Sequence, residues 1–105
     1  MMTKTKINIG SLRSFPVEIG QSIKIGDEEI AIFRLDNNRV YALENRSPHP
    51  KGGIISEGLV SGEFVFCPLY DWKISLKTGE VQTPDEGSIR TFEVEISNEN
   101  VYITL

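Results

Sequence analysis

The chain has 105 residues, and its 11 Lys and Arg against 15 Asp and Glu give a formal net charge of −4. This length predicts a single domain over residues 1–105 with one hydrophobic core, and it excludes a two-domain enzyme with a cleft between its halves. The basic residues are scattered and no apolar run approaches the roughly 18 residues that span a bilayer, so we expect a cytoplasmic protein without nucleic-acid or membrane partners.

Apolar and polar residues alternate along the first half of the chain, after a single helical turn that we expect near 11–15. This period of two predicts β-strands. In the run EEIAIFRL, Ile30 and Ile32 share one face of the strand. Phe33 and Leu35 share the other face, which indicates either a bulge within the run or a strand that is buried on both sides.

Short segments rich in Gly, Asp and Asn separate these runs. Gly26-Asp27 and Asp36-Asn37-Asn38 predict hairpin turns, because these residues tolerate left-handed backbone geometry. Near the C-terminus, RTFEVEI and VYITL flank the segment SNEN and predict a final hairpin.

The middle of the chain has a different character. Residues 45–63 contain four glycines and two prolines, a density that excludes a long helix or strand. A short strand is expected over Phe64–Cys67, where Pro68 ends it, and another over Lys73–Leu76 before a turn and a loop. Eight or nine short strands in all predict an all-β sandwich or small barrel, on which the long loops are the candidate functional segments.

The chain has one cysteine, Cys67, and one histidine, His49. A single cysteine excludes an internal disulfide, which suits a reducing compartment. It also excludes a zinc or iron–sulfur site built from four cysteines.

Two motifs in the loops, Ser47-Pro48-His49 and Cys67-Pro68-Leu69-Tyr70, are separated by 17 residues. They resemble the two cluster-binding loops of the Rieske iron–sulfur family, which read Cys-x-His and Cys-x-x-His with a spacing of about 15–17 residues. The resemblance runs from about residue 23 to the C-terminus and includes Lys51-Gly52-Gly53, Asp71-Trp72 and Thr78-Gly79-Glu80. It implies a Rieske-like fold of short antiparallel strands, with the former cluster-binding loops at 44–85.

Two of the four ligand positions of this motif carry the residue type that the family pattern has. Ser47 stands where the first thiolate would be and Tyr70 where the second imidazole would be, so that His49 and Cys67 alone match. A serine hydroxyl is a poor substitute for a thiolate. A tyrosine becomes a phenolate only near its usual pKa of about 10. We therefore expect no bound 2Fe–2S cluster, no metal and no catalytic residue in this chain, with a 2Fe–2S cluster as the alternative.

The run GLVSGEFVFCPLYDWKISLKTGEVQTPDEG narrows the resemblance to the small subunits of assimilatory NAD(P)H-dependent nitrite reductases. In that group the Rieske-like domain often lacks some or all of the cluster ligands, and the large subunit carries FAD, an iron–sulfur cluster and sirohaem and reduces nitrite to ammonia. The resemblance implies an accessory subunit that docks on such a large subunit. The alternatives are a Rieske-type ferredoxin and a β-domain that mediates contacts in another oxidoreductase system.

Simpler interpretations of the same residues remain open. His49 is expected to hydrogen-bond within its loop, and Cys67 to behave as a small buried apolar residue. A Cys67–His49 dyad, or a zinc site made by His49, Cys67 and Asp71, is a chemical alternative. Trp72 is expected in the core or at its edge, whereas Tyr70 is either packed or facing a partner.

Overall fold

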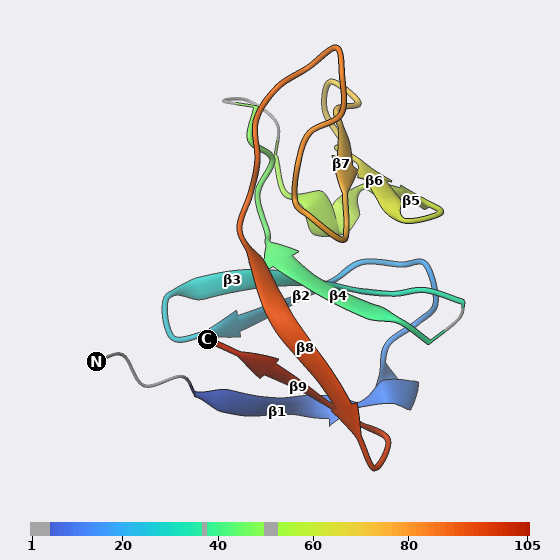
Figure 1. The fold of residues 1–105 in the computed structure, drawn as a ribbon, viewed down its shortest axis with the longest axis vertical. Helices are drawn as coiled ribbons and strands as arrows, with labels where there is room; N and C mark the ends of the chain where they lie inside the picture. The colour runs from blue at the N-terminus through green and yellow to red at the C-terminus, as the bar shows by residue number, and fades with distance from the viewer. Residues whose placement is uncertain (1–4, 37, 50–52) are drawn as a thin grey trace.

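The computed structural model describes residues 5–36, 38–49 and 53–105, and these residues form nine β-strands and two 3-10 turns (Figure 1). Six strands form one antiparallel sheet in the order β1-β9-β8-β4-β3-β2, and three form a second in the order β5-β6-β7. In Figure 1 the six-stranded sheet is the lower part of the molecule, and the small sheet and its loops lie above it. The all-β prediction is confirmed.

The elements have the following bounds. The six-stranded sheet contains β1 (Lys6–Ser11), β2 (Gln21–Ile25), β3 (Glu28–Arg34), β4 (Val40–Glu44), β8 (Thr91–Ser97) and β9 (Asn100–Thr104). The small sheet contains β5 (Leu59–Ser61), β6 (Phe64–Phe66) and β7 (Lys73–Ser75). The 3-10 turns are η1 (Leu12–Ser14) and η2 (Ile55–Glu57). No helix among these described elements has the length and apolar character that a membrane crossing requires.

The predicted turns join the strands as expected. Gly26 has a left-handed φ of 60° in the β2–β3 turn, and Asn98 and Glu99 have φ values of 50° and 65° in the β8–β9 turn. In the β3–β4 hairpin, Asn38 has a φ of 62° and donates its backbone N–H to the Leu35 carbonyl at 2.9 Å. Asn37 of that predicted turn lies outside the described residues, as do Lys51 and Gly52 of the family motif.

The sequence patterns miss two strands. β1 pairs with β9, but its register shifts between Asn8 and Gly10, where Gly10 has a φ of 124°. This bulge interrupts the alternation that would have identified the strand. β5 is only three residues long and lies within the glycine-rich segment, and β6 ends at Phe66, one residue before the predicted end.

Strand β3 is buried on both faces, which decides between the two interpretations of its sequence. Its register with β2 and with β4 is continuous, so the strand contains no bulge. Ile30 and Ile32 pack on one side with Val101 and Ile103 of β9. The other face carries Phe33 and joins a second core, shared with the small sheet, that contains Ala31, Leu35, Leu43, Ile55, Val65, Cys67, Ile74, Leu76 and Ile89. The second core fixes the small sheet and its loops on β3 and β4.

Polar contacts also join the two sheets. The Tyr41 hydroxyl on β4 donates to Glu63 Oε2 at 2.8 Å, and Arg39 Nη1 donates to the same oxygen at 2.7 Å. Both donors favour the ionised carboxylate, so they lower the pKa of Glu63, with the Tyr41 hydrogen bond contributing most.

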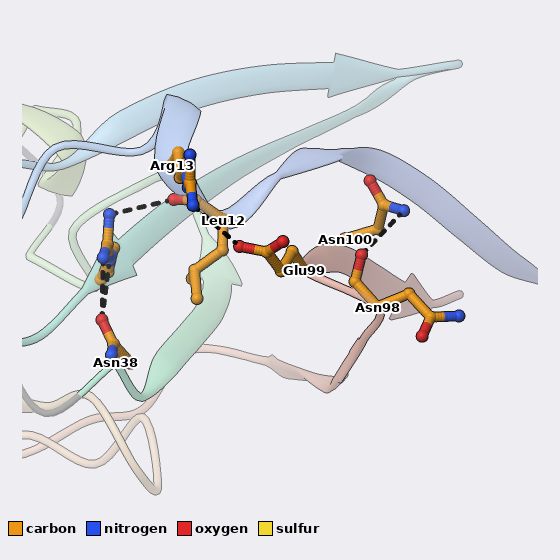
Figure 2. Close-up of polar contacts among 7 residues, drawn as sticks. Leu12, Arg13, Asn38, Asn98, Glu99 and Asn100 are labelled. Atoms are coloured by element: carbon orange, nitrogen blue, oxygen red, sulfur yellow. Dashed lines mark hydrogen bonds and ion pairs between the residues drawn. The ribbon is translucent and has the colours of Figure 1, made fainter.

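A separate set of polar contacts closes one end of the six-stranded sheet (Figure 2). Arg34 Nη1 donates to the backbone oxygens of Leu12 and Phe15, both at 3.1 Å, and its Nη2 donates to Asn38 Oδ1 at 2.8 Å. Arg13 forms an exposed ion pair with Glu99 at 3.4 Å. These contacts hold η1 against the β3–β4 and β8–β9 turns and do not involve the candidate loops.

Candidate functional site

The candidate site lies where three loops meet beside the small sheet. The first loop follows β4 and contains residues 45–49, the second joins β6 to β7 and contains 67–72, and the third is 83–88. A side chain placed at Gly87 would lie 3.2 Å from Pro48, so the third loop packs against the first. A side chain placed at Gly53 would lie 3.8 Å from both Pro68 and Leu69, which brings the segment after the first loop against the second.

The inner part of the site is a buried thiol–hydroxyl pair. Cys67 Sγ donates to Ser47 Oγ at 3.1 Å, and the cysteine is only 1% exposed. Ser47 Oγ also accepts the backbone N–H of His49 at 3.2 Å, and the Ser47 N–H donates to the Gly53 carbonyl at 2.8 Å. Ser47 thus connects its own loop to Cys67 through direct hydrogen bonds.

The outer part of the site is a pair of stacked rings. The His49 and Tyr70 rings are 4.1 Å apart between centroids and 15° from parallel. The His49 and Trp72 rings form a T-shaped pair, 4.9 Å between centroids and 80° between planes. Tyr70 is 59% exposed, whereas Trp72 is half-buried against the second core, as expected for the edge of the core. Tyr70 and the following Asp71 both have left-handed φ values, 67° and 48°, which are uncommon for residues with side chains.

The four sequence-predicted positions therefore lie together in two pairs. A Rieske cluster has two thiolates on one iron and two imidazoles on the other. Here Ser47 and Cys67 pair in the buried layer, and His49 and Tyr70 pair in the exposed layer. The pairing follows the family pattern, but each pair has exchanged one ligand for an oxygen group.

The side chains at this site do not fit a 2Fe–2S cluster. They offer one thiol and one imidazole where the cluster requires two of each. The Cys67 thiol and the Ser47 hydroxyl are in direct contact, and the His49 and Tyr70 rings are stacked. In both pairs the two side chains therefore contact each other.

The zinc site and the Cys67–His49 dyad are the other chemical alternatives at these positions. Among the described residues, no three His, Cys, Asp or Glu side chains gather as metal ligands, so His49, Cys67 and Asp71 do not form the zinc site considered from the sequence. Burial raises the pKa of the Cys67 thiol and is the largest contribution. The Ser47 hydrogen bond lowers this pKa by less, and the Asp71 carboxylate makes the smallest contribution, which raises it. A protonated, buried thiol is a poor nucleophile and a poor ligand.

The state of this thiol can be measured by alkylation. We expect iodoacetamide at pH 8 to modify Cys67 at least about tenfold more slowly in the native protein than in urea, because burial keeps the thiol protonated and out of contact with the reagent. Mass spectrometry of samples quenched over time gives both rates. Equal rates would mean that the loops open readily and that the Ser47–Cys67 contact is not maintained in solution.

Sequence reasoning missed two parts of the site. Asn45 is buried, donates to the hydroxyls of Ser22 and Ser56 at 3.0 Å, and accepts the Ser56 N–H at 2.9 Å, so it anchors the start of the first loop. The third loop was included in the predicted site only as far as residue 85, so that residues 86–88 were left outside. Gly87, with a φ of 139° and close to Pro48, is the residue that could have indicated it.

A pocket of about 500 Å³ lies beside the loops. Its lining is formed by Arg46, Ser47, Pro48, His49, Gly53, Gly87 and Ser88. The pocket borders the His49 and Ser47 positions and not the exposed face of Tyr70.

Comparison with known proteins identifies relatives over most of the chain. A family model described as a Rieske-like [2Fe-2S] domain matches residues 6–104. The chain is 29% identical over 86 residues to the nitrite reductase (NADH) small subunit of Escherichia coli (strain K12). The matched region covers 77% of this chain and 80% of that protein. It is 30% identical over 78 residues to the ferredoxin subunit of a 3-phenylpropionate/cinnamic acid dioxygenase from Photorhabdus laumondii, with 73% of each chain covered.

A larger protein also contains a similar segment. The chain is 32% identical over 99 residues to the nitrite reductase [NAD(P)H] large subunit of Klebsiella oxytoca, a match that covers 90% of this chain but only 10% of that protein. Among solved structures, the NMR structure of the Escherichia coli protein NirD superposes with a TM-score of 0.85 at 23% identity, covering 98% of both chains. The predicted Rieske-like fold and the resemblance to nitrite reductase small subunits are confirmed.

Proposed function

Because this chain belongs to the Rieske-like [2Fe-2S] domain family and is similar to nitrite reductase small subunits, we propose that it is the accessory small subunit of an NAD(P)H-dependent nitrite reductase. In this proposal it docks on a large subunit that carries FAD, an iron–sulfur cluster and sirohaem and that reduces nitrite to ammonia. The chain itself binds no 2Fe–2S cluster and contributes contacts instead of redox chemistry.

The hydrogen bond between Cys67 and Ser47 is the observation that carries this proposal. At the positions where the family pattern has two thiolates, this chain has a thiol and a hydroxyl in direct contact at 3.1 Å. A domain without a complete donor set cannot relay electrons through a Rieske cluster. Such a domain can still contribute a binding surface. A segment similar to this chain makes up about 10% of the Klebsiella oxytoca large subunit, which supports the association of this chain with an enzyme of that kind.

Metal analysis tests the proposal directly. We expect protein produced with ample iron and purified without oxygen to be colourless and to contain no stoichiometric iron or acid-labile sulfide, because Ser47 and Tyr70 replace two of the four ligands. Binding to the purified large subunit of the same organism is measured alongside. Iron and sulfide at two atoms each per chain would contradict the proposal.

A Rieske-type ferredoxin is the second candidate. His49 and Cys67 keep one imidazole and one thiol on the two loops, and the relative from Photorhabdus laumondii is named as a ferredoxin subunit. A red-brown colour, with an electron paramagnetic resonance signal on reduction, would support this candidate over the accessory subunit.

A further inference from the structure

Three apolar side chains near the site are exposed in the folded chain. Ile54, Leu69 and Tyr70 are 37%, 51% and 59% exposed. Tyr70 follows Leu69 directly, and Leu69 lies against Gly53, the neighbour of Ile54 in sequence. We refer to Ile54, Leu69 and Tyr70 as the loop tip. The remaining large exposed apolar residues of the described chain are Val17, Ile19, Leu59 and Ile96.

Contacts within the loops hold the Tyr70 ring of the loop tip. Tyr70 stacks on His49, which forms a T-shaped pair with Trp72. The Cys67 N–H donates to the Trp72 carbonyl at 2.9 Å and closes the turn that presents Tyr70. An aromatic side chain that is already ordered loses little conformational entropy on binding, which favours it as an interface anchor.

Three acidic residues lie in the loops that meet at the site. Asp71 follows Tyr70, and Asp85 and Glu86 precede Gly87, which packs against Pro48 beside His49. Among the described residues of these loops, Arg46 is the one Lys or Arg side chain, and it pairs with Glu44 at 3.3 Å. An apolar centre with a carboxylate border favours a partner surface that is apolar at its centre and basic at its edge.

We propose that the loop tip is the face that binds the nitrite reductase large subunit, and that it binds an apolar depression bordered by Lys and Arg side chains. This inference rests on the proposed function and adds the docking face and the chemistry of the partner. Tyr70 and Leu69 enter the depression, and Asp71, Asp85 and Glu86 face the basic border. The exchange of a cluster ligand for Tyr70 thus places an aromatic anchor at the exposed layer of the site.

Binding to the purified large subunit, measured by biolayer interferometry, tests the apolar part. We expect Leu69→Asp and Tyr70→Asp each to weaken binding by at least about 30-fold, because a charge in a desolvated anchor position is costly. Tyr70→Phe is expected to bind as the unchanged chain does, because it keeps the ring. The matched controls are Leu59→Asp on β5 and Ile19→Asp before β2, at residues that are 73% and 58% exposed. Their affinity is expected to be unchanged.

Salt dependence tests the charged part. We expect the triple variant Asp71→Asn, Asp85→Asn and Glu86→Gln to associate more slowly and to lose most of the salt dependence of the association rate. Asp27→Asn, in the β2–β3 turn, is the control and is expected to leave both unchanged. Circular dichroism confirms the fold of each variant.

The outcomes separate the docking face from the proposed function. If the controls weaken binding and the loop-tip variants do not, the face lies elsewhere while the accessory-subunit proposal stands. If the unchanged chain does not bind the large subunit at all, the proposed function fails, and the docking face fails with it.

Discussion

A chain that carries both Ser47→Cys and Tyr70→His is expected to bind a 2Fe–2S cluster. The reason is geometric, because Ser47 already lies beside Cys67 at 3.1 Å and Tyr70 already stacks on His49. The two changes complete a thiolate pair in the buried layer and an imidazole pair in the exposed layer, which is how a Rieske cluster is held. After anaerobic reconstitution with iron, sulfide and a thiol reductant, we expect about two irons per chain and a red-brown colour.

The two single variants are the matched controls for this experiment. Ser47→Cys alone and Tyr70→His alone each leave one oxygen ligand in place, and we expect neither to retain stoichiometric iron through gel filtration. Electron paramagnetic resonance of the reduced double variant distinguishes a Rieske site from iron bound elsewhere. A double variant that folds, yet stays colourless, would mean that the loops have lost the geometry or the supporting hydrogen bonds that hold a cluster.

The alternation of apolar residues was enough to predict most of the fold. The pattern of Ile30 and Ile32 against Phe33 and Leu35 left a bulge and a strand buried on both sides as alternatives. The structure shows the second, with the two faces in separate cores. Strand β1 was not predicted, because the bulge before Gly10 interrupts the alternation of apolar and polar residues. The extent of the domain, residues 1–105, stays a prediction.

The candidate site was predictable as a set of positions but not as a set of contacts. The spacing of the two motifs identified Ser47, His49, Cys67 and Tyr70, and these residues do lie together. The thiol–hydroxyl bond and the ring stack depend on how two loops meet in space, which no local pattern encodes. The part played by Asn45 was hidden for the same reason, since its partners Ser22 and Ser56 are distant in sequence.

The second core, shared by the two sheets, should be the most sensitive part of the molecule to truncation. Phe33 is fully buried in it, and a Cβ on Gly20 would lie only 2.8 Å from the Phe33 ring. Phe33→Ala would remove the largest fully buried side chain of this core. We expect the free energy of unfolding to fall by about 3–5 kcal/mol, a large part of the roughly 5–15 kcal/mol that stabilises a typical domain.

Phe64→Ala is the matched control, because it makes the same chemical change at a half-exposed ring whose face is covered by Lys73 at 4.3 Å. We expect it to cost only about 1 kcal/mol, since less apolar surface returns to water. Urea denaturation followed by the fluorescence of Trp72, which packs against the same core, measures both variants. A loss for Phe33→Ala no larger than that for Phe64→Ala would show that the small sheet and its loops are not held on β3 by this core, and that the loop tip must be positioned by the polar contacts of Tyr41, Glu63 and Arg39 instead.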